Sequence, residues 1–148
     1  MPQSLSAVYV HLVFSTKERR THISKDLKEE LHAYIAKTLS NNGCHAITIN
    51  SMPDHIHILY DLSRSLTMAK VAQEVKTGSS RWLKNQNAEW GGWQLGYGSF
   101  SVSESLLGQV SRYIKRQEEH HQKMSFQEEF RTLLRKHRIE FDENYVWD

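Results

Sequence analysis

Hydrophobic and polar residues alternate in the first part of the chain with the period of two that is typical of a β-strand. In residues 7–15 the apolar side chains of one face are Val8, Val10, Leu12 and Phe14. Residues 45–52 and 55–62 are predicted to form two further strands. Because the turn-forming pair Pro53-Asp54 lies between them, these two strands are expected to pair as a hairpin.

Two segments between the strands carry apolar residues at helical spacing. The first has Leu27, Leu31, Ile35 and Leu39 on one stripe, with Ser24 as the expected N-cap and Gly43 as the expected terminator. The second contains Met68, Val71, Ala72, Val75, Ser79, Trp82 and Leu83. Residues 87–98, rich in Trp, Gly and Asn, favour a loop, and residues 99–103 favour a short strand.

The last third of the chain is predicted to be helical. Ser101 or Ser103 would cap a helix that runs to about residue 122. In that helix the side chains of Leu106, Val110 and Ile114 would face the interior of the protein. Ser125 and Glu128 have the spacing of a capping box for a final helix, which holds Phe130, Leu133 and Leu134.

The resulting order of elements is β-α-β-β-α-β followed by helices. This order is typical of the ferredoxin-like, or RRM-like, class of α+β folds, in which helices pack on one face of an antiparallel sheet. A chain of 148 residues is long enough for one good core, so a single domain over residues 1–148 is expected.

Composition limits the classes of protein further. With 39% hydrophobic and 24% charged residues, the chain matches an ordinary soluble globular protein. We expect no signal peptide at its start, and no apolar run approaches the roughly 20 residues that span a bilayer, so no membrane association is expected. Cys44 is the only cysteine, which excludes an internal disulfide and favours a cytoplasmic location.

Charge is unevenly distributed, although the net charge is only +2. Residues 64–84 contain several basic residues and one acid, Glu74, whereas acids gather near the C-terminus. This segregation would permit a positive face that neutralises phosphates. Ordinary solvated helix faces explain any one of these clusters equally well.

His55 and His57 form the first candidate site. Because side chains on a strand alternate, both imidazoles would leave one face while Ile56 and Ile58 point to the other. Two neighbouring imidazoles can bind a divalent metal. Nine histidines in 148 residues would give roughly 0.5 such pairs by chance, so a third ligand is needed to distinguish a metal site from a solvated strand face.

The segment from residue 111 to residue 123 could supply that ligand. Tyr113 and Gln117 are one helical turn apart, and His120 and His121 follow them. A tyrosine with an ordinary pKa of about 10 is a nucleophile only if its phenolate is favoured. Either the basic neighbours Arg112, Lys115 and Arg116 or a metal-bound phosphate could favour it. Alternatively, Tyr113 packs beside Val110, and the two histidines only contact the end of a helix dipole.

Several ordered blocks of the sequence resemble one known family. They are VYVHLVFSTKERR, MPDHIHIL, GYGSFSVS, YIKRQEEHHQKMSFQEEF and EFDENYVWD. Together they cover nearly the whole chain. They are similar to the single-tyrosine HUH transposases, the TnpA-type enzymes of small insertion sequences that move as single strands.

The resemblance implies roles for particular residues and for several partners. Tyr113, on a C-terminal helix, would be the catalytic nucleophile, and His55, His57 and Gln117 would hold Mg²⁺ or Mn²⁺. Apart from the resemblance, His120 and His121 could be auxiliary residues that supplement Gln117 at the metal or orient Tyr113. The enzyme would cleave and rejoin single-stranded DNA through a 5′-phosphotyrosine. Family members are homodimers in which one subunit's tyrosine can serve the other's histidines, and they recognise subterminal hairpins.

Expected DNA contacts complete the prediction. The basic residues predicted to contact the DNA phosphates are Lys17, Arg19, Arg20, Lys76, Arg81, Lys84, Arg112 and Arg116. Trp90, Trp93 and Tyr97 would either stack on unpaired bases or pack in the protein.

Three alternatives stay open at this point. The first is a domesticated nuclease or nickase that acts on chromosomal palindromes, and the second is a non-catalytic ferredoxin-like module that binds RNA or DNA. The third is a metal-storage or structural site built from Cys44, His45, His55 and His57.

Overall fold

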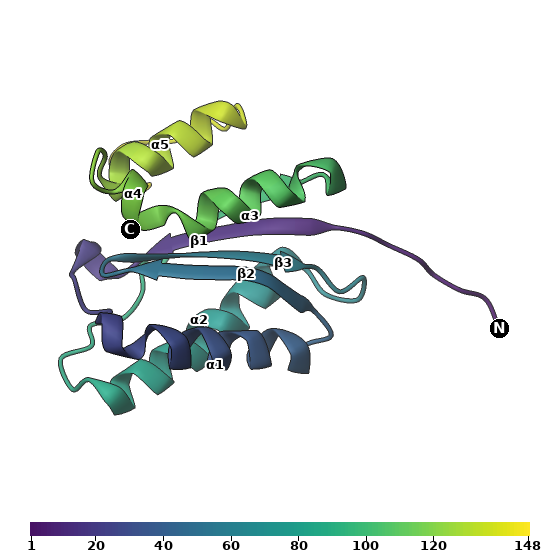
Figure 1. Ribbon diagram of the computed structural model, residues 1–148, viewed down its shortest axis with the longest axis horizontal. Helices are drawn as coiled ribbons and strands as arrows, with labels where there is room; N and C mark the ends of the chain where they lie inside the picture. Colours follow the sequence, from purple (N-terminus) through teal and green to yellow (C-terminus); the bar gives the residue numbers. More distant parts are fainter.

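Four antiparallel strands form the centre of the computed structural model, which describes residues 1–148 (Figure 1). The strands are β1 (Tyr9–Ser15), β2 (His45–Met52), β3 (His55–Asp61) and β4 (Gly98–Val102). Their order in the sheet is β2-β3-β1-β4. Helix α1 (Lys28–Asn41) connects β1 to β2, and α2 (Met68–Gln86) connects β3 to β4. The predicted ferredoxin-like α+β fold is therefore confirmed.

One face of the sheet builds the main core together with α1 and α2. Alternation along β1 and β3 places Val10, Leu12, Phe14, Ile56, Ile58 and Tyr60 on this face, where all are buried. The apolar stripes of the two helices pack against them, as their helical spacing predicts. A rigid platform results, and it fixes the direction of every side chain on the opposite face.

The opposite face is covered as well, which corrects the expectation of helices on one face. Helices α3 (Leu107–Lys115), α4 (Gln117–His120) and α5 (Phe126–Lys136) lie across it, as Figure 1 shows. Val13, Leu59 and Phe100 on this face are buried beneath them. The strands thus carry apolar residues on both faces, so each face requires a helical cover.

The long helix expected up to residue 122 is broken. A short 3₁₀ helix, η3 (Glu104–Leu106), precedes α3, and the backbone leaves helical geometry at Arg116 before α4 begins. The side chain of Asn50 on β2 donates a hydrogen bond of 2.9 Å to the carbonyl oxygen of Ile114. In a continuous helix that carbonyl would accept from the amide four residues later. Leu106, predicted to turn inward, is 46% exposed because it lies before α3 begins.

Helix ends follow the predicted capping in part. The side chain of Ser125 accepts a hydrogen bond from the Glu128 amide at the start of α5, as the capping-box spacing predicts. Ser24 makes no such bond, and α1 starts only after a 3₁₀ turn, η2 (Lys25–Leu27). Gly43 follows α1 with φ of +73°, which explains why glycine ends this helix. None of the helices combines the length and the hydropathy that a membrane crossing requires.

The C-terminal segment holds α5 in place. Trp147 packs against Phe126 and Phe130, and its indole donates to Glu143, which also pairs with Arg131. The backbone oxygen of Asp148 accepts a hydrogen bond of 2.9 Å from the Gly96 amide, in the loop before β4. Another 3₁₀ turn, η1 (Lys17–Arg19), follows β1 and places the Arg19 guanidinium over Trp147. These contacts fix α5, which contributes to the site described below.

Gly98 on β4 leaves no room for a side chain between the sheet and α5. A Cβ atom there would lie 2.6 Å from a ring carbon of Phe130 and 2.9 Å from the Phe100 ring. We expect Gly98→Ala to destabilise the fold by about 1–3 kcal/mol, because α5 must shift away from the sheet. Urea denaturation followed by circular dichroism measures this change.

Gly78→Ala is the matched control for this prediction. Gly78 lies within α2, and an added Cβ would have no neighbour closer than 3.4 Å. Alanine there should stabilise the fold by about 0.5–1 kcal/mol, since glycine disfavours a helix. Equal free energies of unfolding for the wild-type and Gly98→Ala proteins would contradict the prediction and show that the Phe130 ring can move aside without destabilising the fold.

Candidate active site and metal centre

His55 and His57 lie on the sheet face that α4 and α5 cover, and both are fully buried. They share that face, as alternation along β3 predicts. Nδ1 of His55 lies 2.7 Å from Oδ1 of Asp54, which can only accept a hydrogen bond as a carboxylate. Nδ1 therefore carries a hydrogen, and Nε2, the other ring nitrogen, faces the interior of the site.

His57 has a second histidine behind it. Its Nδ1 lies 2.8 Å from Nε2 of His11 on β1, and the two rings stack with their centroids 5.0 Å apart. Burial, followed by the nearby His57, holds the pKa of His11 well below its usual range. Sequence reasoning did not single out His11, although the alternation in β1 places it on the same face as Val13, which pairs with His57.

Gln117 reaches the histidine pair as expected. It is the first residue of α4 and has no exposed surface. Its Oε1 lies 3.2 Å from Nε2 of His55. The break at Arg116 directs α4 at the histidines, so the bond between Asn50 and Ile114 that accompanies the break also positions this side chain.

Glu129 on α5 is the residue that the sequence analysis missed. It is 1% exposed, and its Oε1 lies 3.1 Å from Nε2 of His57 and 3.5 Å from Nε2 of His55. The run QEEF resembles a solvated, charged helical turn. The available signal was its spacing, because Glu129 lies between Phe126 and Phe130 on the apolar stripe of α5, where an unpaired acid would be costly.

The two auxiliary histidines take different positions. Nε2 of His121 lies 2.9 Å from Oε1 of Gln117 and 3.0 Å from Oε1 of Glu129, so His121 joins the cluster. His120 instead stacks on the Tyr113 ring, with centroids 4.6 Å apart and 28° between the planes. Each of the two histidines thus contacts a specific side chain of the site, so the alternative that they only contact the end of a helix dipole is wrong.

The cluster has the donor set of a divalent-cation site. Ligand atoms of His55, His121 and Glu129 all lie within 4.8 Å of one another. Nε2 of His55 lies 3.2 Å from Oε1 of Gln117 and 3.5 Å from Oε1 of Glu129, and nitrogen and oxygen donors grouped in this way can share one cation. Burial opposes ionisation of Glu129, but hydrogen bonds from His121 and His57 hold the pKa of its carboxyl well below its usual range. The charged carboxylate and the imidazoles therefore fit a divalent metal.

Tyr113 lies on α3 directly beside this cluster. Its ring centroid is 6.1 Å from that of His57, and its hydroxyl donates a hydrogen bond to Oε2 of Glu129. Burial, followed by the negative charge of Glu129, raises the pKa of this hydroxyl. The expectation that neighbouring cations favour the phenolate is wrong for this arrangement, because Arg112, Lys115 and Arg116 are exposed and an acid faces the phenol.

Most of the basic residues predicted to contact DNA have exposed side chains, although Arg20 pairs with Glu18 and the Lys84 ammonium donates to the carbonyl oxygen of Ala88. The exposed ones are Lys17, Arg20, Arg81, Lys84, Arg112 and Arg116. Lys76 has another role, because its ammonium donates to the carbonyl oxygens of Gln94, Leu95 and Gly96 at 2.7, 3.0 and 2.7 Å. Burial lowers the pKa of Lys76 to about 8. It fastens the loop before β4 and is not placed to contact phosphates.

Trp90 and Trp93 are core residues, so the prediction that they stack on bases is wrong. Both are buried, and their indole nitrogens donate to the hydroxyls of Ser80 and Ser79 at 2.8 and 3.0 Å. Packing in the protein, the other expectation for these residues, is confirmed. Tyr97 is 38% exposed, and its stacking on bases stays a prediction.

The alternative metal site with Cys44 and His45 is contradicted by the geometry. Cys44 packs into the core on the α1 and α2 side of the sheet, opposite to the face of His55 and His57. His45 is exposed and pairs with Asp61, whereas His55 pairs with Met52 at the other end of β2. These four side chains cannot share one ion.

Comparison with known proteins shows what the chain is similar to. The model of the family described as IS200-like transposases matches residues 4–117. The ISDra2 transposase TnpA of Deinococcus radiodurans is 26% identical over 114 residues, which cover 72% of this chain and 81% of that protein. The family match includes His55, His57, Tyr113 and Gln117 and stops before Glu129.

Two solved structures share the fold. One is a Deinococcus radiodurans protein described as a transposase, with a TM-score of 0.62 and 23% identity over 79% of this chain and 98% of that chain. The other is a REP-associated tyrosine transposase bound to a REP hairpin, with a TM-score of 0.59 and 13% identity over 82% of this chain and 74% of that chain. At these identities the likeness supports the architecture alone.

Proposed function

The chain belongs to the IS200-like transposase family and has a transposase function, and from this premise we propose that it cleaves and rejoins single-stranded DNA at insertion-sequence ends through a 5′-phosphotyrosine on Tyr113. One observation carries the proposal. The Tyr113 hydroxyl is hydrogen-bonded to Glu129, whose other oxygen contacts His57. The proposed nucleophile and the proposed metal ligands are therefore neighbours within one chain.

The proposed metal ligands are His55, His57 and Gln117, to which the geometry adds Glu129 and His121. Mixed imidazole and oxygen ligands suit Mn²⁺ chemically, whereas Mg²⁺ is favoured by its abundance, and zinc suits a phosphate site with octahedral geometry less well. The chemistry that a bound divalent cation supplies is polarisation of the scissile phosphate and compensation of its developing charge. Asp54 and His11 hold the rings of His55 and His57 from behind.

In the proposed reaction, the oxygen of Tyr113 attacks the scissile phosphorus. Its proton already points to Oε2 of Glu129, which is the atom placed to accept it. A bond forms between phosphorus and the phenol oxygen, the bond to the 3′ oxygen breaks, and that oxygen takes up a proton as a free 3′-OH. Attack by another 3′-OH reverses the step at a new junction, so the ester conserves the bond energy and no ATP is consumed.

Partners of the enzyme belong to the same proposal. Hairpin-bearing single strands are the proposed substrate, supported by the similar REP-associated transposase that was solved with a hairpin. We also propose a homodimer, a cytoplasmic location and one domain over residues 1–148. Within this chain the Tyr113 ring centroid lies 6.1 Å from that of its own His57, which supports assembly of the active site in cis.

Two alternatives with different biology differ in what they predict. A domesticated nuclease would share the chemistry, and its gene would lack hairpin-bearing element ends on both sides. A non-catalytic nucleic-acid module would bind hairpins without cutting them. The buried cluster of His55, His57 and Glu129 favours an enzyme over such a module, because burying titratable groups is costly and groups with shifted pKa values gather at functional sites.

A strand-cleavage assay tests the proposal. Labelled single strands that carry the element ends are incubated with the protein and Mn²⁺ and separated on a denaturing gel. We expect a protein–DNA adduct on one of the two product strands only, and none when the metal is chelated. If the strands are cut without an adduct, or are not cut at all, the phosphotyrosine mechanism is excluded.

A further inference from the structure

A cavity of about 290 Å³ opens between α3, α5 and the edge of the sheet at β4. Its inner wall includes Tyr113 and Glu129, so it adjoins the site of the proposed phosphate transfer. The volume is equivalent to about ten water molecules and approaches the lower end of small-ligand pockets. The proposed mechanism assigns no role to this space.

The walls of the cavity suit a flat ring with polar edges. Phe100 and Leu133 provide an apolar surface, and His137 stacks on Phe100 with centroids 4.6 Å apart. Polar groups of Ser101 and Thr132 stand at the periphery. Aromatic and aliphatic walls with a few polar groups at the edge are typical of sites that hold unpaired nucleobases.

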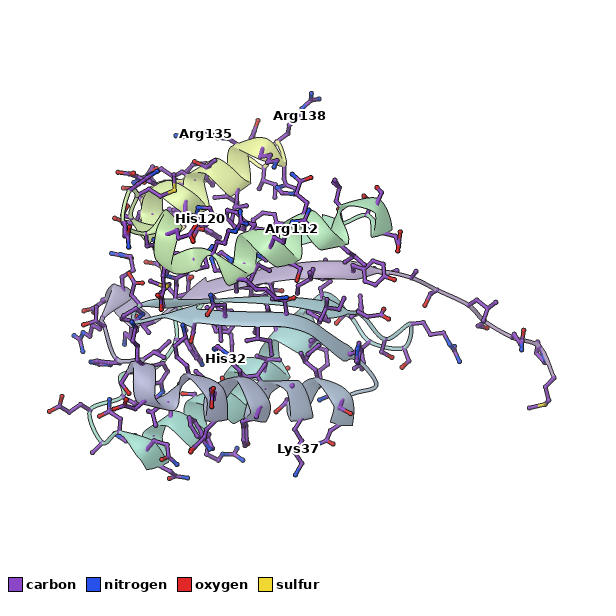
Figure 2. All side chains as sticks on the ribbon, viewed as in Figure 1. His32, Lys37, Arg112, His120, Arg135 and Arg138 are labelled. Carbon is purple, nitrogen blue, oxygen red and sulfur yellow. The ribbon has the colours of Figure 1, made fainter.

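His120 supplies the second observation. Its Nε2 atom is buried and has no hydrogen-bond partner in the protein. The same ring lines the cavity and stacks on Tyr113, as its place between α3 and α5 in Figure 2 suggests. Buried polar atoms are nearly always paired, so a partner for this nitrogen is expected from a bound molecule.

Charge around the cavity is complementary to a nucleic acid. Lys136 on α5 lines the opening, and Arg112 extends from α3 (Figure 2). Apart from Glu129 at the inner wall, the lining contains no acid. A strand whose phosphate reaches Tyr113 would thus meet positive charge on both sides of the opening.

We propose that this cavity holds the unpaired nucleobase next to the scissile phosphate, with Nε2 of His120 bonded to the edge of the base. The inference rests on the proposed function, because it places the phosphate at Tyr113. A base is separated from its own phosphate by one sugar, so a phosphate at the Tyr113 hydroxyl brings the adjacent base to the cavity. Withdrawing that base from the strand's stack would position the phosphate for attack.

Photo-crosslinking tests the cavity without requiring cleavage. The probe is a pool of mixed-sequence single strands with 4-thiothymidine in place of thymidine, and crosslinked peptides are identified by mass spectrometry. We expect crosslinks in the lining peptides around Phe100 and Thr132–His137. Thr132→Trp, which fills the exposed rim of the cavity, should reduce them about tenfold, as for loss of one stacked base.

Glu128→Trp is the matched control, one turn away on the exposed face of α5 and outside the cavity. It should leave the crosslinks unchanged, whereas His120→Phe, which keeps the ring and removes Nε2, should weaken them. Absence of crosslinks from the lining peptides, or crosslinks that persist in Thr132→Trp, would overturn the proposal. Since no cut strand is needed, a failed cleavage assay and a failed crosslinking assay point to different errors.

Discussion

Replacing Tyr113 with phenylalanine should reduce strand cleavage by roughly 10³-fold or more and abolish the protein–DNA adduct, because the ring then lacks the attacking oxygen. Hairpin binding should persist. The fold should persist as well, since the Glu129 oxygen that accepts from Tyr113 also accepts a 2.9 Å bond from Nε2 of Gln117. The denaturing gel measures the adduct, and a native gel with the same strand measures binding.

Tyr145→Phe provides the control for this substitution. Tyr145 is 70% exposed in the C-terminal segment, so loss of its hydroxyl should leave cleavage and binding unchanged. A Tyr113→Phe protein that still forms an adduct would place the nucleophile elsewhere in the chain. A Tyr113→Phe protein that neither binds nor cuts the strand would indicate that the Tyr113 hydroxyl is required for folding. This outcome would remove the support for its catalytic role.

Glu129→Gln should have the next largest effect. The amide keeps the shape of the side chain and removes the negative charge that faces His55, His57 and His121. We expect the affinity for Mn²⁺ to fall by about 10–100-fold, the range observed when groups around a metal site are altered. Calorimetry or the electron paramagnetic resonance of free Mn²⁺ measures this in the absence of DNA, so the result does not depend on cleavage.

Glu128→Gln removes the same charge one residue earlier, at an exposed position, and should leave Mn²⁺ binding unchanged. This comparison separates a local role of the buried carboxylate from a general effect of net charge. If Glu129→Gln binds Mn²⁺ as the wild type does, the metal is held without α5. Glu129 would then act only as the hydrogen-bond partner of Tyr113.

Parts of the site were predictable because they depend on local geometry. The alternation along β3 places His55 and His57 on one face whatever the rest of the chain does. The spacing of Tyr113 and Gln117 brings both to the histidines even though the helix between them is broken. That break was not predictable. The Ile114 carbonyl oxygen that it frees accepts a hydrogen bond from Asn50, which lies 64 residues away in the sequence.

The sequence by itself determined the order of strands and helices, the shared face of the two histidines and the resemblance that proposes Tyr113 as the nucleophile. Only the tertiary structure decided which charged residues are buried. Glu129, Lys76 and His121 occur in runs that look solvated, and each is partly or wholly buried with partners distant in the chain or on another element. A buried charge is stable only where several elements converge on it, and such convergence leaves no local pattern in the sequence.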